Sequence, residues 1–265
     1  MTEQLVVAER LGSCLILRLN RPGSGNAINR EVAESLGAHL RACAADATLG
    51  TLVLTGAGER YFCTGGDVKA YAQLASPAEL DRVFNLMREV CDALERLPCP
   101  VIAAINGYAV GGGAEMSLAC DLRVAEASAQ IGFPQSRLGI MPGWDGTARL
   151  LRTVGRSAAA RLLFSGKRVS AAEARELRLV DEVVPDGTAL ARALALASTF
   201  AEVAPLSLGA IKQALREAGD ADTAQSAEQA RVRAREAFAR LWFTEDHDEA
   251  EQAFAEKRAP HFSGR

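Results

Sequence analysis

Residues 105–121 read INGYAVGGGAEMSLACD, and they place three consecutive glycines before a single carboxylate, Glu115, in an otherwise small and apolar run. Consecutive glycines cost backbone entropy in a regular element, so they indicate a close approach of the main chain to a ligand. Residues 114–120 have the composition of the first turns of a helix. Because a helix start offers unpaired N–H groups and a positive dipole end, the stretch predicts a site where Glu115 lies beside a developing negative charge.

The segments on either side of this stretch indicate an α/β fold. Residues 51–55 and 101–105 are short apolar runs typical of buried strands, and a glycine-containing loop follows each of them. Strand, glycine-rich loop and helix thus recur twice within about 70 residues, which favours layered sheets with loops converging at one edge. A hairpin is expected over residues 5–19 and a further strand over residues 121–125. Helix starts are predicted at four capping residues: Asn29, Ser76, Ser170 and Asp186.

Helices are expected to dominate from Gly146 to the end of the chain, and the last 60 or so residues are rich in Ala, Glu and Arg. An apolar stripe recurs at helical spacing among these last residues, comprising Ala230, Ala234, Ala237, Phe238 and Leu241. The stripe fits a helix that packs on its own core. It also fits an oligomerisation surface, because a polar helical region with little core of its own can cover a neighbouring subunit.

The overall composition is that of an ordinary globular protein. With 30 basic and 33 acidic residues, the net charge of −3 gives no electrostatic case for nucleic acid or an anionic membrane as a partner. No apolar run approaches the roughly 20 residues that span a bilayer, and the N-terminus has no signal pattern. Six cysteines without CxxC pairs and three scattered histidines predict free, mostly buried thiols, no metal site and a cytoplasmic location.

Three common motifs of other enzyme classes are incomplete or missing. Gly56 and Gly58 form half of a dinucleotide-binding GxGxxG motif, but Tyr61 occupies the third glycine position. Lys167 follows a glycine but is itself followed by arginine, so it does not complete a phosphate-binding P-loop. The chain contains no GxSxG nucleophile elbow. These absences argue against a nicotinamide cofactor, a nucleoside triphosphate and a serine nucleophile.

Two glycine loops are the strongest candidates for a reaction site. TGGD at residues 64–67 and GGG at residues 111–113 each follow a predicted strand. If the loops converge, one N–H group from each can point at one oxygen and form an oxyanion hole, in which a single donor stabilises a transition state by roughly 3 to 4 kcal/mol. The alternative is that both loops are only tight turns.

The chain resembles the crotonase family, the enoyl-CoA hydratase/isomerase superfamily, over nearly its whole length. The resemblance rests on four ordered segments: RYFCTGGDVK, INGYAVGGGAEMSLACDLRVA, FPQSRLGIMPGWDGTARL and SGKRVSAAEARELRLVDEVV. It implies a spiral of ββα units over residues 1–203 and a helical region over residues 204–265 that mediates homotrimers, often paired into dimers of trimers. It also implies an acyl-CoA substrate, with coenzyme A entering as part of that substrate and no separate cofactor.

The resemblance further implies roles for individual positions. The backbone N–H groups of Gly66 and Gly112 would form the oxyanion hole for the thioester carbonyl, and Glu115 matches the glutamate that handles the attacking water. Coenzyme A would lie along two segments, which comprise Ala27 and Ile28 in the first and Gly65, Asp67, Val68 and Lys69 in the second.

Four positions depart from the family pattern. Gln135, 20 residues after Glu115, stands where hydratases have a second glutamate, and a neutral amide is neither an acid nor a base near pH 7. Trp144 and Asp145 stand where small residues and glycine are usual. Trp144 is expected to pack or to narrow the acyl pocket, and Asp145 either caps the next helix or replaces the lost acid. Arg178 occupies a position that is commonly glycine.

The expected activity is hydration of a 2-enoyl-CoA through an enolate stabilised at Gly66 and Gly112, with Glu115 acting on water. The source of the second proton stays open between Glu115, a water held by Gln135, and Asp145. Isomerisation ranks close behind, because one carboxylate suffices to move a proton along the acyl chain. Hydrolysis or decarboxylation of a branched or cyclic acyl-CoA is the third alternative. Binding of acyl-CoA or of another protein without turnover, and a dinucleotide-dependent oxidoreductase, are the remaining ones.

Overall fold

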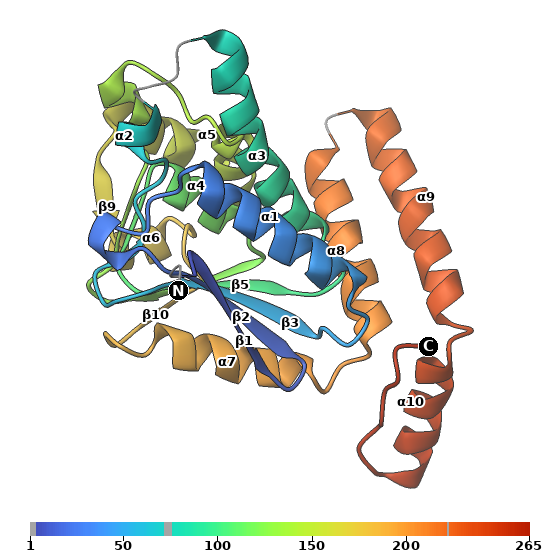
Figure 1. The fold of residues 1–265 in the computed structure, drawn as a ribbon. Helices are drawn as coiled ribbons and strands as arrows, with labels where there is room; N and C mark the ends of the chain where they lie inside the picture. The colour runs from blue at the N-terminus through green and yellow to red at the C-terminus, as the bar shows by residue number, and fades with distance from the viewer. Residues whose placement is uncertain (1–3, 72–75, 222) are drawn as a thin grey trace.

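The computed structural model describes residues 4–71, 76–221 and 223–265, which form two β-sheets enclosed by helices (Figure 1). The larger sheet has six strands in the order β1-β2-β3-β5-β7-β10. They are β1 (Val6–Leu11), β2 (Cys14–Leu19), β3 (Thr51–Gly56), β5 (Val101–Ile105), β7 (Leu122–Glu126) and β10 (Glu182–Val184). The smaller sheet has the order β4-β6-β8-β9. Its strands are β4 (Tyr61–Cys63), β6 (Tyr108–Val110), β8 (Gln130–Gly132) and β9 (Arg168–Ser170).

Three consecutive strand pairs divide between the two sheets, and one or two helices follow each of these pairs. In the pairs β3/β4, β5/β6 and β7/β8, the first strand joins the larger sheet and the second joins the smaller sheet. The helices that follow are α2 (Val68–Tyr71) and α3 (Pro77–Arg96), α4 (Gly112–Leu118), and α5 (Gly146–Ser165), the last preceded by the 3-10 turn η2 (Pro134–Leu138). This arrangement confirms the predicted spiral of ββα units.

The parallel pairing of these strands places the glycine loops at one edge. β4 pairs in parallel with β6, and β6 pairs in parallel with β8. Because parallel strands present their carboxyl ends at the same edge, the loops that follow β4, β6 and β8 lie side by side. The predicted hairpin is also confirmed, since β1 and β2 pair antiparallel.

Three of the four predicted helix caps are confirmed. The helices α1 (Arg30–Ala45), α3 and α6 (Ala171–Glu176) begin where the sequence predicts. Each capping side chain accepts a hydrogen bond from the N–H three residues on: Asn29 from Val32 at 3.0 Å, Ser76 from Glu79 at 3.3 Å and Ser170 from Glu173 at 3.2 Å.

The predicted cap at Asp186 is wrong. The helix α7 (Ala189–Phe200) begins after Thr188, two residues further on. The carboxylate of Asp186 instead accepts a hydrogen bond from the N–H of Ser128 at 2.9 Å, which joins two loops that are 58 residues apart in the chain. The side chain of Asp186, which the local pattern predicts as a helix cap, therefore forms a tertiary hydrogen bond with Ser128 instead.

Arg178 shows why glycine is common at its position. The residue follows α6 and adopts a left-handed conformation with φ of 60°. Only glycine reaches that region without strain, so the arginine here carries a backbone cost that a glycine would avoid.

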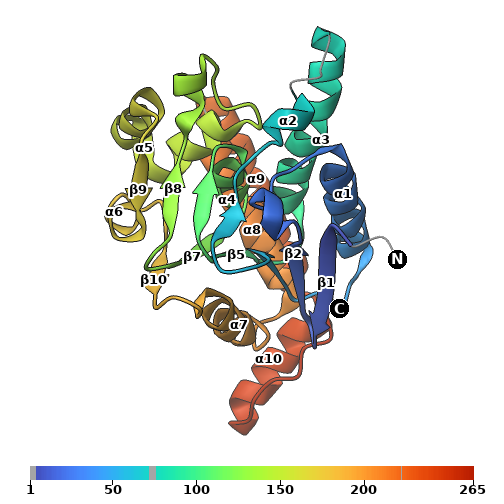
Figure 2. The same cartoon turned by 60° about the vertical axis from the view of Figure 1, so that its left-hand side comes forward.

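The core lies on both faces of the larger sheet. One face packs against α1, α3, α4 and the smaller sheet, and the other is covered by α7, which lies beneath the sheet in Figures 1 and 2. Three alanines of α7 contact the sheet, and they are Ala189, Ala193 and Ala197. The buried thiols that the sequence predicts are confirmed in number and place: Cys14, Cys43, Cys63, Cys91, Cys99 and Cys120.

The C-terminal helices α8 (Pro205–Asp220), α9 (Ala224–Leu241) and α10 (Glu245–Glu256) lie to one side of the sheets, with α9 and α10 standing off from the main body (Figure 1). Several large apolar side chains on or beside them are exposed, among them Leu215, Phe238, Phe243 and Phe254. Among the described helices none alone has the length and hydrophobicity to cross a membrane, whereas α7 and α8 taken together meet both criteria across a bend of 111°.

Candidate active site

Glu115 lies in the first turn of α4, which begins directly after β6. Its side chain is only 1% exposed, so the carboxylate is removed from bulk water. Gly111, just before the helix, has φ of 59°, and this left-handed turn lets the chain pass from strand to helix. A residue with a side chain would be strained in this conformation, which favours glycine at this position.

Four N–H donors surround the carboxylate of Glu115. Oε1 accepts hydrogen bonds from Nε2 of Gln135 at 2.8 Å and from the N–H of Gly143 at 3.3 Å. Oε2 accepts from the N–H of Trp144 at 2.8 Å and from the N–H of Gly146 at 3.0 Å. Since a carboxylate has about four acceptor positions, all of them are occupied.

Two opposing effects act on the pKa of Glu115. Burial disfavours the charged form and raises the pKa, and this is the larger effect. The hydrogen bonds from the backbone N–H groups and from Gln135 favour the charged form and offset part of the shift. The net result is a pKa above the ordinary value, which brings this carboxyl closer to the range useful for proton transfer near neutral pH.

Gln135 lies in η2 and is 7% exposed. Its amide N–H group binds Glu115, whereas its Oε1 has no hydrogen-bond partner among the described residues. The sequence placed these two residues in one site, and the structure brings them into direct contact. An unpartnered buried acceptor beside a carboxylate is a place where a water molecule or a substrate hydroxyl can donate a hydrogen bond.

The two glycine loops also lie against each other. A Cβ atom added to Gly65 would lie 2.7 Å from the N atom of Gly112 and 3.0 Å from the carbonyl oxygen of Val110. Gly65 has φ of 90°, so both its conformation and this close approach require glycine.

The N–H groups of Gly66 and Gly112 lie outside the backbone ladders. Gly112 is the first residue of α4, where no preceding helical carbonyl is available. Gly66 forms a bridge with Ile28, in which Ile28 donates to Gly65 and Asp67 donates to Ile28. Within the described residues, this bridge leaves the N–H of Gly66 unused. Among the described residues, neither N–H group therefore has a backbone acceptor.

Aromatic rings lie over both glycines. The ring of Trp144, which is buried, would be 2.4 Å from a Cβ atom on Gly112. The ring of Tyr71 would be 2.3 Å from a Cβ atom on Gly66, and it packs on Phe84 with ring centroids 5.4 Å apart. Each of these glycines therefore has an aromatic ring where a side chain would otherwise lie.

Asp145 lies on the outside of the loop that binds Glu115. It has a left-handed backbone with φ of 61°, and as the residue before α5 it makes no side-chain cap hydrogen bond. Its side chain is 59% exposed and lies 4.0 Å from Nε of Arg88. The structure therefore places Asp145 beside Arg88 in solvent, while its neighbours Trp144 and Gly146 turn their N–H groups inward to Glu115.

The two segments predicted to bind coenzyme A lie side by side, joined by the bridge between Ile28 and Gly66. Ala27, Ile28 and Gly65 are buried. Asp67 forms an ion pair with Arg21 at 3.1 Å, and Arg21 also donates to the carbonyl of Ala27 at 2.7 Å. Val68 and Lys69 are exposed in α2. The side chain of Lys69 is thus accessible to solvent.

Sequence reasoning missed the loop Gly143–Gly146 as the source of donors for Glu115. Two of its N–H groups belong to glycines, and a Cβ atom on Gly146 would lie 2.3 Å from Cγ of Glu115. The glycines in PGWDGT were the available signal, because they mark a backbone that approaches another group closely.

No group of three or more His, Cys, Asp or Glu side chains that could hold a metal ion is found within residues 4–71, 76–221 and 223–265. The acceptor positions of Glu115 are taken by N–H groups, which a cation would have to displace.

Comparisons with known proteins match the whole length of the chain. The family model described as enoyl-CoA hydratase/isomerase matches residues 9–265. The chain is 38% identical to the 2,3-dehydroadipyl-CoA hydratase of Escherichia coli (98% of this chain, 99% of that protein). It is 35% identical to the short-chain-enoyl-CoA hydratase of Clostridium acetobutylicum (96% and 95%). A crystal structure of an enoyl-CoA hydratase from Bacillus anthracis superposes with a TM-score of 0.92 at 35% identity, covering 99% of this chain and 100% of that one.

Proposed function

Because the chain belongs to the enoyl-CoA hydratase/isomerase family, we propose that it hydrates a 2-enoyl-CoA with Glu115 as its only acid–base carboxylate. The observation that carries this proposal is the contact between Glu115 and Gln135, which leaves one ionisable group where two-carboxylate hydration would need two. The names of the relatives in Escherichia coli and Clostridium acetobutylicum, both hydratases, support hydration over other enolate chemistry.

In the proposed reaction the thioester oxygen accepts hydrogen bonds from the N–H groups of Gly66 and Gly112. Glu115 removes a proton from water as the water oxygen bonds to the β-carbon, and the electrons of the double bond move toward the thioester oxygen. The enolate then collapses and takes a proton at its α-carbon. We assign that proton to Glu115, which has just received it, because Asp145 points into solvent.

Entry of the water requires one acceptor position on Glu115 to become free. The hydrogen bond from Gly143 at 3.3 Å is the longest of the four and is the first to yield. The unpartnered Oε1 of Gln135 can accept a hydrogen bond from the same water. Gln135 thereby orients the water without exchanging protons with it.

Isomerisation of an enoyl-CoA is the second candidate. It moves a proton from one carbon of the acyl chain to another, so a single carboxylate completes it without water. The same contact between Glu115 and neutral Gln135 favours it. Trp144 and Tyr71 over the two glycines favour a short or slender acyl chain in either reaction.

The proposed assembly is a homotrimer or a dimer of trimers formed through the C-terminal helices. The exposed apolar side chains on α8–α10 support it, because a monomer would leave these side chains in water.

The test is to incubate the protein with short, medium and cyclic enoyl-CoA thioesters, following the enone absorbance and the product mass. Hydration adds the mass of one water, isomerisation adds nothing, and loss of carbon dioxide would point to decarboxylation. Glu115→Gln should lower turnover of every accepted substrate by about a hundredfold or more, as expected for removal of an acid–base group. Asp145→Asn is the matched control, and it should retain wild-type turnover. Undiminished turnover in Glu115→Gln would refute the proposed role.

A further inference from the structure

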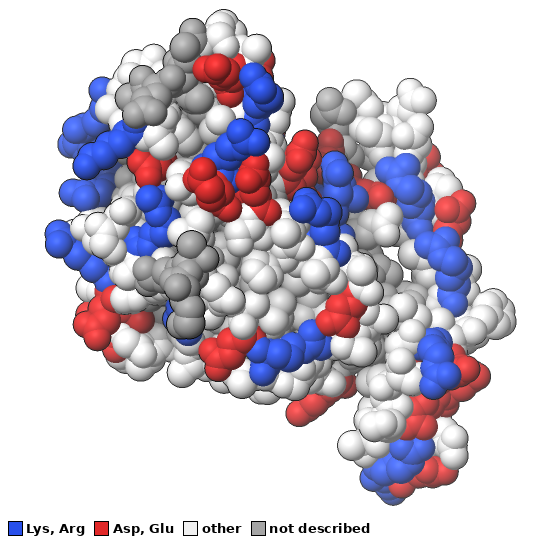
Figure 3. Space-filling model, in the orientation of Figure 1, with Lys and Arg blue, Asp and Glu red and all other residues white. Residues whose placement is uncertain are grey.

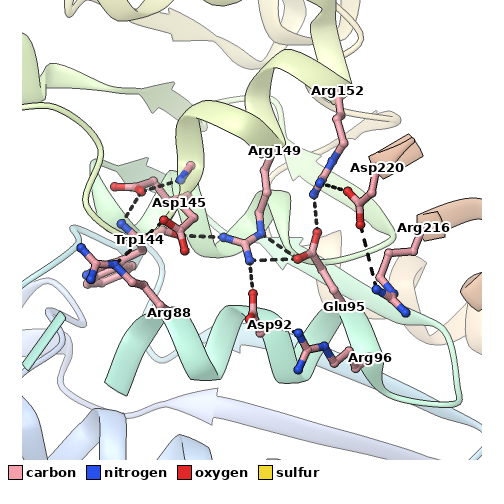
Figure 4. A network of polar contacts seen from close by, with 12 residues as sticks. Arg88, Asp92, Glu95, Arg96, Trp144, Asp145, Arg149, Arg152, Arg216 and Asp220 are labelled. Carbon is pink, nitrogen blue, oxygen red and sulfur yellow. Dashed lines mark hydrogen bonds and ion pairs between the residues drawn. The ribbon is translucent and has the colours of Figure 1, made fainter. Parts of the chain in front are cut away.

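Two arginines contact the loop Gly143–Gly146 through its carbonyl groups. Nε of Arg88, on α3, donates to the carbonyl oxygen of Gly143 at 3.0 Å. Nη1 of Arg149, on α5, donates to the carbonyl oxygen of Trp144 at 2.6 Å. Figure 4 shows the two guanidinium groups on either side of Trp144, where α3 and α5 face each other. The loop is thus bound by cations at its carbonyls and by Glu115 at its N–H groups.

The peptide unit between Gly143 and Trp144 links Arg88 to Glu115 directly. Its carbonyl accepts from Arg88, and its N–H donates to Oε2 of Glu115 at 2.8 Å. The C=O and N–H bonds of a trans peptide point in opposite directions, so fixing one fixes the other. A cation on the carbonyl also polarises the peptide and strengthens the N–H as a donor.

Arg149 acts on the next peptide unit, which lies between the two N–H groups that bind Oε2 of Glu115. With its carbonyl held by Arg149, the chain has little freedom to rotate the N–H of Trp144 or that of Gly146 away from the carboxylate. Arg149 is therefore placed to hold both donors at once.

Arg149 is itself firmly held. Its side chain is 4% exposed, and it also donates to Asp92 at 2.8 Å and to Glu95 at 2.9 Å, both on α3. Glu95 in turn pairs with Arg152, which reaches Asp220 of α8. Charged side chains of both signs gather where α3 faces α8 in Figure 3. A buried guanidinium with every partner in place has a fixed orientation.

We propose that Arg88 and Arg149 are positioning residues, which hold the loop Gly143–Gly146 so that its N–H groups face the carboxylate of Glu115. Among the contacts of Glu115 with the described residues there is none with either guanidinium, so both arginines act on it through the loop. The predicted effect on turnover rests on the proposed function of Glu115. The predicted effect on the pKa of Glu115 does not depend on that function.

The groups that surround Glu115 indicate that the two arginines influence its pKa through the loop. Neutral Gln135 contacts it from η2, and the thiol of Cys91 on α3 is the nearby titratable group, whose own pKa is raised by burial. The remaining contacts are the three backbone N–H groups of the loop. Loss of these donors disfavours the charged carboxylate, so releasing the loop must raise the pKa of Glu115 further.

The first test needs no substrate. Titration of side-chain carboxyl groups by ¹³C NMR, with the Glu115 signal assigned by its loss in Glu115→Gln, should show Glu115 titrating at higher pH in Arg88→Gln and in Arg149→Met than in the wild type. Arg82→Gln on α3 and Arg161→Met on α5 are the matched controls, since Arg82 is exposed and Arg161 pairs with Glu173, away from the loop and from the partners of Arg149. Both controls should leave the titration of Glu115 unchanged.

The second test follows turnover of an accepted enoyl-CoA. Arg88→Gln and Arg149→Met should lower kcat by about tenfold, with KM nearly unchanged, and should move the acid limb of kcat/KM to higher pH. Arg149→Lys, which keeps the charge, should recover part of the loss.

Wild-type titration of Glu115 in Arg88→Gln and Arg149→Met would overturn the proposal. If Arg149→Met fails to fold, Arg88→Gln decides alone, since Arg88 lies nearer the surface. A protein that turns over no enoyl-CoA would refute the proposed function, and the NMR titration would still decide the role of the two arginines.

Discussion

At the scale of single residues, the pKa of Glu115 predicts how activity depends on pH. Glu115 must be ionised to remove a proton from water. Since burial raises its pKa, kcat/KM should fall as the pH drops through a midpoint above about 4.3, the ordinary value for a glutamate. Initial rates across pH, with circular dichroism at each pH to show that the protein stays folded, provide the check. A rate that stays constant down to that ordinary value would contradict the prediction.

Gln135 offers a gain-of-function prediction. Gln135→Glu would set a second carboxyl about where the amide nitrogen now lies, 2.8 Å from Oε1 of Glu115. Two carboxyls so close cannot both ionise, so one stays protonated near neutral pH and can donate its proton to the α-carbon. Hydration of crotonyl-CoA should rise by about tenfold or more.

The matched control for this gain is Gln135→Met, which has a similar shape and no titratable group, and which should show no rise. Equal rates in Gln135→Glu and the wild type would mean that the pocket differs from two-carboxylate hydratases in more than this position.

The resemblance could place Glu115 and Gln135 in one site, but neither their direct contact nor the parts played by Arg88 and Arg149 could be predicted from the sequence. Glu115 and Gln135 are 20 residues apart within motifs that can be aligned with the family. Arg88 meets its carbonyl partner across 55 residues. An arginine on a helix carries no local sign of which carbonyl it will reach, because that choice depends on how α3 and α5 pack.

At the scale of elements, a buried lysine, Lys212, joins α8 to the core in addition to the ion pair between Arg152 and Asp220. Nζ of Lys212 donates to the carbonyls of Leu94 and Cys99 at 2.9 and 3.0 Å, and it lies 2.8 Å from Oδ2 of Asp121. Leu94 lies near the end of α3, Cys99 lies just before β5, and Asp121 lies just before β7. All three ammonium protons are therefore used, and they join α8 to three separate segments.

Lys212→Met should lower the free energy of unfolding by about 2 kcal/mol, because it leaves buried acceptors without a donor. Urea unfolding followed by circular dichroism measures the loss. Gln213→Met, one residue along on the exposed face of α8, is the control and should change stability by less than about 0.5 kcal/mol. Similar midpoints for the two variants would show that Lys212 contributes nothing to the attachment of α8.

Apolar runs and capping residues in the sequence predicted most of the helices and strands. The prediction failed where a residue distant in the sequence bound the capping side chain. The apolar runs at β3 and β5 and the caps at Asn29, Ser76 and Ser170 depend on neighbours within three or four residues, which the sequence displays. Asp186 shows the same local pattern, but the N–H of Ser128 takes its carboxylate. Whether such a side chain caps a helix or binds another loop depends on the tertiary structure, and a local sequence pattern carries no information about that.

At the scale of the whole molecule, the exposed apolar side chains of the C-terminal helices predict the assembly. Light scattering coupled to size exclusion should give three or six times the chain mass of 28.1 kDa. Phe254→Ser should weaken the assembly, because Phe254 is 87% exposed in the single chain and an interface would bury it.

Phe164→Ser is the control, since Phe164 is equally exposed but lies on α5, outside the C-terminal helices. It should leave the mass unchanged. A wild-type protein that elutes with the mass of one chain would contradict the proposed assembly.

The spiral of ββα units could be predicted as a whole from the resemblance, and its physical basis is visible in two repeats of the sequence. The division of strand pairs between two sheets could not be read from those repeats. A short apolar run is compatible with either sheet, and the packing of all the described strands together decides which sheet it joins.

The six buried thiols make it possible to measure opening of the folded core by chemical labelling. Burial shields them from solvent and raises the pKa of Cys63 and of Cys120 to about 12, so the native protein offers a thiol reagent almost no reactive thiolate. The rate at which such a reagent is consumed therefore measures how often the core opens. Cys14 lies on the face of the larger sheet that α7 covers, and Cys63 lies at the end of β4, two residues before Gly65. The order in which the two thiols are labelled would therefore show which of these two regions opens first.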